Sequence, residues 1–207
     1  MELLGKHIGE FVKLSGKNFL FVRHGECMAN YSGVLAGFLD SRLTVKGREQ
    51  AHSLYQHIYP HINSFNNIYC SDLQRAIDTA EISLGFPEQK IIQQKPILRE
   101  INFGKEENLH FDSLPDDRKQ LINSIDFQSE GGESWHDVRK RVIKFMSQQP
   151  DGNHLVYSHG GLMCSLTWYI GLQDTVPNCS AIGMQVDSEG VPQKLHFVWE
   201  YPETEEL

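Results

Sequence analysis

The amino-acid sequence predicts an α/β protein with a largely parallel central sheet that is covered by helices on both faces. Two observations predict this fold class. Short uninterrupted apolar runs, typical of strands buried on both faces, alternate along the chain with longer segments whose apolar residues recur at helical spacing. The composition is also that of a globular protein, because 40% of the residues are hydrophobic and 22% are charged.

Five segments have the character of strands. The first three are continuous apolar runs, and the last alternates between apolar and polar residues. We expect strands at 19–22, 67–70, 154–157, 181–186 and 195–199.

Four further segments show helical spacing, and we expect helices at 44–59, 72–84, 134–147 and 160–170. Gly85 and Pro87 would close the second helix, and Ser134 with Asp137 would cap the third. The fourth helix is apolar nearly all round, which predicts that it is buried.

The chain of 207 residues is expected to form a single domain, 1–207, with a short lid-like polar insertion at about 105–132. No low-complexity stretch, internal repeat or Gly/Ser linker divides it. Within the insertion we expect Lys105 to be a solvated surface lysine, and Glu106 and Glu107 to be a solvated acidic run. The first 16 residues suggest no function.

The charge balance argues against some partners. The chain has 27 acidic and 19 basic residues and a formal net charge of −8, so nucleic acid and anionic membrane surfaces are not expected as partners. No apolar run approaches the ~20 residues of a membrane span. The N-terminal segment lacks the apolar core of a secretory signal. We therefore expect a cytoplasmic protein in which four cysteines stay reduced, namely Cys27, Cys70, Cys164 and Cys179.

No metal and no other cofactor is expected. The cysteines form no C-x-x-C pair, and no Cys/His spacing is that of a zinc site. His57 and His61 are four residues apart, but Pro60 between them is expected to end the helix there.

Reactive side chains follow three of the expected buried strands. Arg23 and His24 follow the first strand, Arg75 lies shortly after the second, and His159 follows the third. In sheets of this kind ligands bind beyond the carboxyl ends of the strands. Two arginines and two histidines would therefore meet at one edge of the sheet and form a local cationic pocket.

Such a pocket suits phosphate chemistry. Guanidinium groups offer paired donors that match phosphate oxygens. A neutral imidazole is a competent nucleophile near pH 7, and nearby arginines should lower its pKa. Gly25 and Gly160, each next to a histidine, would let the backbone approach a bound oxyanion.

A series of short motifs runs in order through residues 18–170. It comprises Arg23-His24-Gly25-Glu26, Asn30, Gly37, Asp40, Leu43-Thr44, Gly47, Gln50-Ala51, Ser71-Asp72-Leu73, Arg75-Ala76, Thr79-Ala80, Leu98-Arg99-Glu100, Phe103-Gly104, Gly131-Gly132-Glu133-Ser134 and Ser158-His159-Gly160-Gly161. In these residues the chain resembles the histidine phosphatase superfamily, which is also called phosphoglycerate mutase-like. The resemblance implies a three-layer α/β/α sandwich and covalent phosphoryl transfer.

Carried over residue by residue, the resemblance implies that His24 attacks phosphorus and becomes a phosphohistidine. Arg23, Arg75 and His159 would hold the transferring oxygens and stabilise charge in the transition state. Glu100 would give a proton to the leaving alkoxide and then take one from the incoming water. Further phosphate or substrate contacts are implied for Asn30, Gly37 and Gly160.

The chain departs from the family pattern at two positions. Cys27 stands where the family usually has threonine, so a hydrogen-bonding hydroxyl is lost. Asn108 stands where a glycine is common, so the loop over the substrate is expected to differ.

These residues predict a metal-independent phosphohydrolase that acts on a small phosphorylated metabolite, with a sugar phosphate as one candidate. The alternatives are a phosphoglycerate mutase and a weakly catalytic phosphate-binding module. The lid favours hydrolysis, because only 26 residues separate Gly104 from Gly131 and its basic residues are few, namely Lys105, Arg118 and Lys119.

Overall fold

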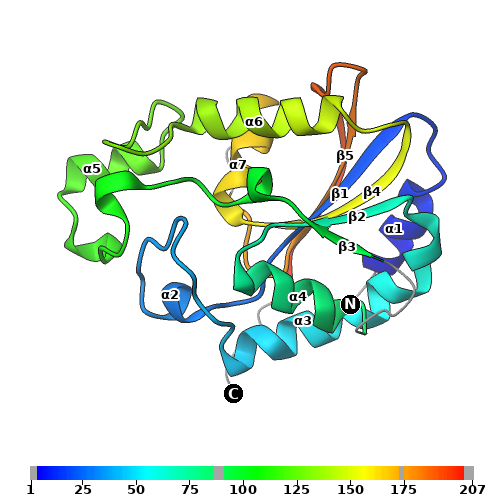
Figure 1. Cartoon of the computed structure of the whole chain (residues 1–207), viewed down its shortest axis with the longest axis horizontal. Coiled ribbons are helices and arrows are strands. Elements are labelled where there is room, and N and C mark those ends of the chain that lie inside the picture. Colours follow the sequence, from blue (N-terminus) through cyan, green and yellow to red (C-terminus); the bar gives the residue numbers. More distant parts are fainter. Residues whose placement is uncertain (1–3, 86–90, 173–174, 203–207) are drawn as a thin grey trace.

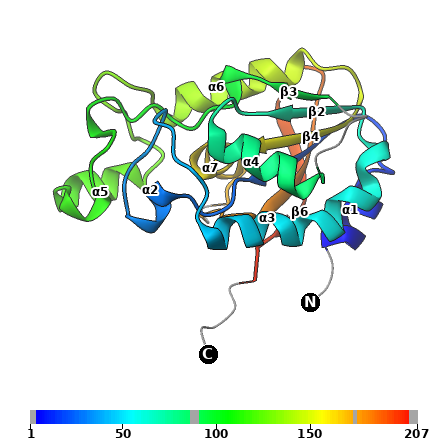
Figure 2. The ribbon, with the colours of Figure 1, turned by 60° about the horizontal axis from the view of Figure 1, so that its bottom comes forward.

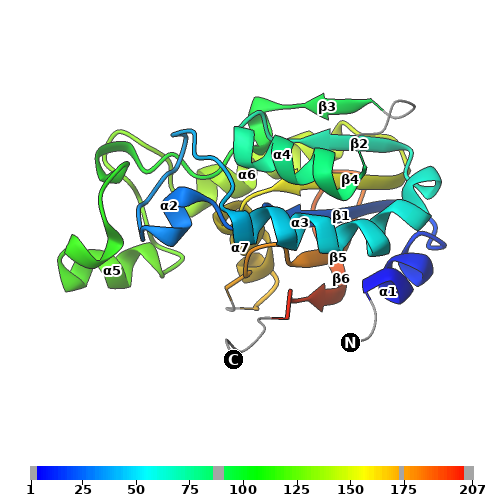
Figure 3. The ribbon, with the colours of Figure 1, turned by 90° about the horizontal axis from the view of Figure 1, so that it is seen from below.

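The computed structural model describes residues 4–85, 91–172 and 175–202. Within them a six-stranded sheet has the order β3-β2-β4-β1-β5-β6, which can be followed from one edge to the other in Figure 3. Its strands are β1 (Lys17–Arg23), β2 (Asn67–Cys70), β3 (Ile92–Gln94), β4 (Gly152–Ser158), β5 (Ala181–Val186) and β6 (Pro192–Trp199). Five of these six run in one direction and β5 runs against them, so the prediction of a largely parallel sheet is confirmed.

Helices cover both faces of the sheet, as the three-layer expectation required (Figure 1). On one face lie α1 (Leu4–Phe11), α3 (Val45–Ile58) and α4 (Gln74–Ser83), and on the other lie α6 (Trp135–Ser147) and α7 (Gly160–Tyr169). Because side chains alternate along a strand, β1 feeds both cores. Phe19 and Phe21 pack with α6 and α7, whereas Leu20 and Val22 pack with α1, α3 and α4.

The predicted helices are present, and local hydrogen bonds fix their ends. Thr44 caps α3, with its Oγ1 accepting from the Gly47 N–H at 3.0 Å, and Ser134 caps α6 together with Asp137 as predicted. The helix α4 begins at Gln74, two residues later than expected, because the Gln74 N–H donates to the Asp40 carboxylate at 2.8 Å. Pro87, expected to follow this helix, lies outside the described residues.

Some elements were not expected from the sequence. The helix α1 packs its buried residues Leu4, Ile8 and Phe11 into one core, which gives this helix a structural role. The strand β3 has only three residues and lies at the sheet edge, so it carries too little pattern to predict. The remaining short elements are α2 (Met28–Tyr31), α5 (Asp116–Ile122) and the 3₁₀ turns Tyr59–Ser64, Pro96–Leu98, Gly104–Glu106 and Phe111–Ser113. None of the helices in the described ranges is long and apolar enough to cross a bilayer.

The insertion at 105–132 holds α5 and lies at the same end of the molecule as α2, as Figure 2 shows. The expectation of solvated Glu106 and Glu107 is wrong. Glu106 pairs with Arg118 and accepts from the Ser129 hydroxyl at 2.8 Å, and Glu107 accepts from the Phe38 N–H at 2.8 Å. The Glu106 carboxylate therefore connects two parts of the insertion, and the Glu107 carboxylate connects the insertion to the backbone at Phe38. Lys105 is exposed as expected and pairs with Glu130.

Candidate active site

Three distant segments bring their side chains together beyond the carboxyl ends of β1, β2 and β4. The rings of His24, which follows β1, and His159, which follows β4, have centroids 5.1 Å apart. Arg75, in the first turn of α4, donates from Nε to Nδ1 of His159 at 3.3 Å. Arg23 lies against the start of α7, where a Cβ on Gly160 would come 3.0 Å from the guanidinium. The convergence predicted from the sequence is therefore present.

His24 is buried, with 3% of its surface exposed, and its hydrogen bond defines its tautomer. Nδ1 lies 2.7 Å from the carbonyl oxygen of Gly25. Because a carbonyl can only accept, Nδ1 carries the proton, and Nε2 keeps its lone pair. Burial, and then the charges of Arg75 and Arg23, hold the pKa of His24 well below its usual 6.5. The imidazole is therefore neutral near pH 7, and Nε2 has the free lone pair that nucleophilic attack requires.

The turn after His24 is set by a backbone contact with α3. A Cβ on Gly25 would lie 2.4 Å from the Gly47 carbonyl oxygen, and a Cβ on Gly47 would lie 1.9 Å from the Glu26 carbonyl oxygen. Both positions therefore require glycine. The Gly25 N–H also donates to Thr79 Oγ1 at 3.0 Å, which ties the turn to α4.

Arg75 is 2% exposed and bonds to the loop at 37–39. Its two terminal nitrogens donate to the carbonyls of Gly37 and Leu39, each at 2.8 Å. Together with the bond to His159, three of the five guanidinium N–H groups are used, which leaves two for an anion. Gly37 therefore contacts Arg75 through its carbonyl oxygen. Its φ of 49° lies in the left-handed region that favours glycine.

Arg23 presents an unsatisfied donor. One terminal nitrogen donates to the Val176 carbonyl, while the buried Nε has no hydrogen-bond partner among the described residues. Burial lowers the pKa of Arg23, and the nearby Glu100 carboxylate opposes that effect. A buried donor without a partner is unfavourable, so an anion that reached Nε would stabilise the site.

Glu100 sits at the N-terminus of α7. Its carboxylate accepts from the N–H groups of Gly161 at 3.0 Å, Leu162 at 3.1 Å and its own neighbour Ile101 at 2.9 Å. A carboxylate in that position satisfies free N–H groups and interacts favourably with the helix dipole. The side chain also lines a cavity that Arg23 borders.

Two residues that support Glu100 were missed or only partly recognised from the sequence. Arg141, on α6, donates to the backbone carbonyls of Arg99 and Glu100 at 2.9 and 2.8 Å. Its Nε donates to Glu133 at 2.8 Å. Glu133 belongs to the glycine-rich motif before α6, but Arg141 lies in no motif, so only the packing of α6 assigns it this position.

Both ring nitrogens of His159 are engaged by protein groups. Nδ1 accepts from Arg75, so Nε2 carries the proton and donates to Ser71 Oγ at 2.8 Å. Burial and then the Arg75 charge hold the pKa of His159 well below 6.5. In this arrangement His159 orients Arg75, and contact with an anion would require one of these bonds to break.

Asn30 and Cys27 form one unit at the start of α2. The Asn30 Oδ1 accepts from the Cys27 N–H at 3.2 Å, from its thiol at 3.1 Å, and from Asn178 Nδ2 at 3.2 Å. The thiol therefore supplies a hydrogen bond where the family's usual threonine would offer a hydroxyl. Asn178 Nδ2 also lies 3.0 Å from the His24 carbonyl, which links the unit to the turn after β1.

The Asn108 departure has a simple structural explanation. Asn108 adopts a φ of 66°, a left-handed conformation that favours glycine and that asparagine tolerates better than most residues. Its N–H donates to the Leu35 carbonyl at 2.9 Å, which ties this turn to the loop that follows α2.

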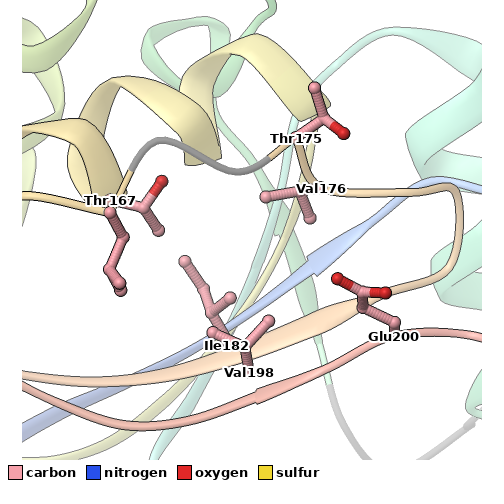
Figure 4. A pocket seen from close by; sticks show the side chains of 7 residues that line it. Thr167, Thr175, Val176, Ile182, Val198 and Glu200 are labelled. Atoms are coloured by element: carbon pink, nitrogen blue, oxygen red, sulfur yellow. The ribbon is translucent and has the colours of Figure 1, made fainter.

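Two cavities adjoin the segment at 175–176. One, of about 190 Å³, is bordered by Arg23 and Glu100. The other, of about 200 Å³, lies between the end of α7 and strands β5 and β6, and Figure 4 shows Ile182, Val198 and the Glu200 carboxylate around it. No cation lines this second cavity in the described ranges, whereas the first combines the Arg23 guanidinium with the Glu100 carboxylate. Across the same ranges, no cluster of His, Cys, Asp and Glu has the makings of a metal site.

The fold and the paired histidines and arginines can be compared with known families. A family model described as "Histidine phosphatase superfamily (branch 1)" matches residues 19–187. The chain belongs to the histidine phosphatase superfamily, as its sequence motifs predicted.

Relatives in this superfamily carry different activities in their names. The chain is 33% identical to an adenosylcobalamin/alpha-ribazole phosphatase of Escherichia coli K12, over 70% of this chain and 74% of that protein. It is 35% identical to a probable phosphoglycerate mutase, GpmB, of Yersinia enterocolitica, over 73% of this chain and 74% of that protein. Among solved structures, TTHB049 of Thermus thermophilus superposes with a TM-score of 0.75 at 27% identity, covering 89% of this chain and 99% of that one. The family therefore supports an enzyme, either a phosphatase or a mutase.

Proposed function

We propose that the chain is a phosphohydrolase that removes phosphate from a small phosphomonoester through a phosphohistidine at His24. The observation that carries this proposal is the state of His24, which is buried, neutral and unengaged at Nε2 among the described residues. A binding module needs no such nucleophile. The partner is then a small phosphorylated metabolite.

The proposed reaction has two steps. His24 Nε2 attacks phosphorus and the bond from phosphorus to the ester oxygen breaks. Glu100, which must take up a proton before this step, gives that proton to the departing alkoxide. Water then attacks the phosphohistidine, loses a proton to Glu100, and the phosphorus–nitrogen bond breaks to release phosphate. Arg23 Nε and the two free N–H groups of Arg75 stabilise the charge on the transferring oxygens.

The insertion supports hydrolysis over mutase transfer. A mutase must hold the carboxylate of phosphoglycerate as well as its phosphate, which requires additional cations. The three basic residues of the lid pair with acidic residues of the same insertion: Lys105 with Glu130, Arg118 with Glu106, and Lys119 with Asp116. The cavity beside Glu100 is bordered by one cation, Arg23, within the described residues.

The test is to measure phosphate release from a panel of phosphomonoesters, and in parallel the conversion of 3-phosphoglycerate in the presence of a bisphosphoglycerate primer. We expect release of phosphate without a primer. His24→Asn should lower turnover by at least roughly 10³-fold and abolish the acid-labile phosphoryl group on quenched protein. Rapid formation of 2-phosphoglycerate with little free phosphate would overturn hydrolysis in favour of mutase activity, and substantial residual activity in His24→Asn would overturn the nucleophile.

A further inference from the structure

The cavity beside Glu100 has an apolar and largely aromatic wall. Its volume is about 190 Å³, and apolar cavities of ~150 Å³ are known to admit a benzene ring. Apart from Arg23 and Glu100, its wall includes Phe103, Ile122, Trp135, Cys164, Trp168 and Val176. A proton donor for the leaving group therefore borders a space shaped for apolar atoms.

The aromatic part of this wall is held in place. Trp135, which is 4% exposed, donates from Nε1 to the Ile122 carbonyl at 3.1 Å. Trp168 packs against it at a centroid distance of 5.5 Å and an interplanar angle of 80°, and Phe103 at 6.4 Å and 89°. Such edge-to-face contacts are favourable geometries for aromatic rings. The wall is therefore a preformed surface that an apolar ring could contact without rearrangement.

The charges around the cavity make it a poor site for a polar or anionic alcohol. Arg23 is the one cation that lines it in the described part of the chain, and the proposed reaction uses that guanidinium for phosphate. Two arginines of the elements that contribute to this wall are engaged elsewhere, since Arg118 of the insertion pairs with Glu106 and Arg141 of α6 pairs with Glu133. Besides Arg23 and Glu100, the polar side-chain groups of the lining are those of Asn123 and Thr175 and the Nε1–H of Trp168, which has no partner among the described residues. Most hydroxyl groups of a sugar would therefore lose water there without gaining a hydrogen bond, which is unfavourable.

We propose that this cavity is the leaving-group subsite, and that the preferred substrates are phosphomonoesters whose alcohol carries an aromatic or similarly bulky apolar group. Sugar phosphates and phosphoglycerate would be poor substrates. The inference rests on the proposed phosphohydrolase function and adds the chemical class of its substrate. The phosphate end would lie at Arg23, and the apolar end would lie against Trp135 and Trp168.

The test compares kcat/KM for benzyl phosphate, ethyl phosphate and glucose 6-phosphate, with 4-nitrophenyl phosphate as a measure of general activity. Benzyl and ethyl phosphate both have unactivated leaving alcohols, so their ratio reports binding of the ring rather than leaving-group chemistry. We expect benzyl phosphate to exceed each of the other two by ~10-fold or more, as one buried apolar ring would give.

Two variants make the test specific. Trp168→Ala removes part of the proposed wall at a partly exposed position, and should bring the benzyl-to-ethyl ratio down toward one. Val198→Ala, in the second cavity and 46% exposed, is the matched control and should keep the wild-type ratio. Equal kcat/KM for all the unactivated esters, or an unchanged ratio in Trp168→Ala, would overturn the subsite while the hydrolase function stood. Failure to release phosphate from any ester, 4-nitrophenyl phosphate included, would overturn both.

Discussion

The Glu100 carboxylate accepts a hydrogen bond from the Gly161 N–H at 3.0 Å, so the proposed proton donor also closes the N-terminus of α7. The contact leaves no room for a side chain at 161, where a Cβ would come 2.5 Å from Glu100 Oε1. This contact fixes the position of Glu100, the proposed acid, relative to α7, the helix that follows His159. A change at Glu100 should affect both chemistry and stability.

Glu100→Gln should separate these two effects. General acids typically contribute roughly 10²–10⁴-fold, so benzyl phosphate should slow by about 10²-fold or more, while 4-nitrophenyl phosphate, with its good leaving group, should slow far less. Loss of one acceptor at the helix end should lower Tm by about 2–4 °C for a chain of this size. Steady-state rates and thermal melts measure the two effects. Glu49→Gln, on the exposed side of α3, is the control, and equal slowing of both esters by Glu100→Gln would contradict the role of acid.

The acid side of the pH–rate profile should report His24. Burial and the charges of Arg75 and Arg23 lower the pKa of its imidazole, so the neutral nucleophile persists below the usual 6.5. The value of kcat/KM should therefore stay constant as the pH is lowered past 6.5, and it should fall only when His24 becomes protonated. The measurement is kcat/KM for 4-nitrophenyl phosphate from pH 4.5 to 8. An acid limb centred at or above 6.5 would contradict a nucleophile in this environment.

Gly47→Ala should damage the site from a distance. A Cβ there would lie 1.9 Å from the Glu26 carbonyl oxygen, and backbone cannot rotate away as a flexible side chain could. Overpacking of this kind typically costs about 1–3 kcal/mol, and here it would also displace the turn that carries His24. The free energy of unfolding in urea and kcat/KM should both decrease. Gly5→Ala, on α1, is the control, because its Cβ would meet nothing closer than 3.7 Å. If Gly47→Ala kept the wild-type free energy of unfolding and kcat/KM, the prediction would be contradicted, because the two backbone segments could then separate.

Buried His154 should make the protein less stable as the pH falls. Burial chiefly lowers the pKa of its imidazole in the folded protein, whereas the unfolded chain has the usual value near 6.5. The unfolded state therefore binds more protons below pH 6.5. The contribution of His154 to the free energy of unfolding should stay constant above pH 6.5 and should decrease as the pH falls below 6.5. One such group gives at most about 1.4 kcal/mol per pH unit.

Urea unfolding at pH 7.5, 6.5 and 5.5 measures this dependence. His154→Gln should be less stable at pH 7.5 but should show a shallower decrease toward pH 5.5, because one proton-binding group has gone. His52→Gln, at an exposed position of α3, should keep the wild-type slope. A His154→Gln slope equal to that of the wild type would show that His154 does not contribute to the pH dependence.

The sequence by itself predicted every described strand of the sheet except β3, the helices α3, α4, α6 and α7, and the meeting of His24, Arg75 and His159. Apolar runs and helical spacing are local signals, and the edge at which parallel strands end follows from their direction alone. The motif series also pointed to the superfamily. The ends of the helices were predicted least well, because α4 starts where Asp40, 34 residues away in sequence, supplies its cap.

Only the tertiary structure decided how these residues are held. The tautomer of His24, the engagement of both nitrogens of His159 and the support of Glu100 by Arg141 depend on contacts between residues far apart in sequence. Glu106 and Glu107 have the sequence pattern of a surface run, and only their partners, Arg118 and the Phe38 N–H, give them a structural role. The apolar wall beside Glu100 joins side chains from the insertion, α6 and α7, so no single stretch of sequence carries its pattern.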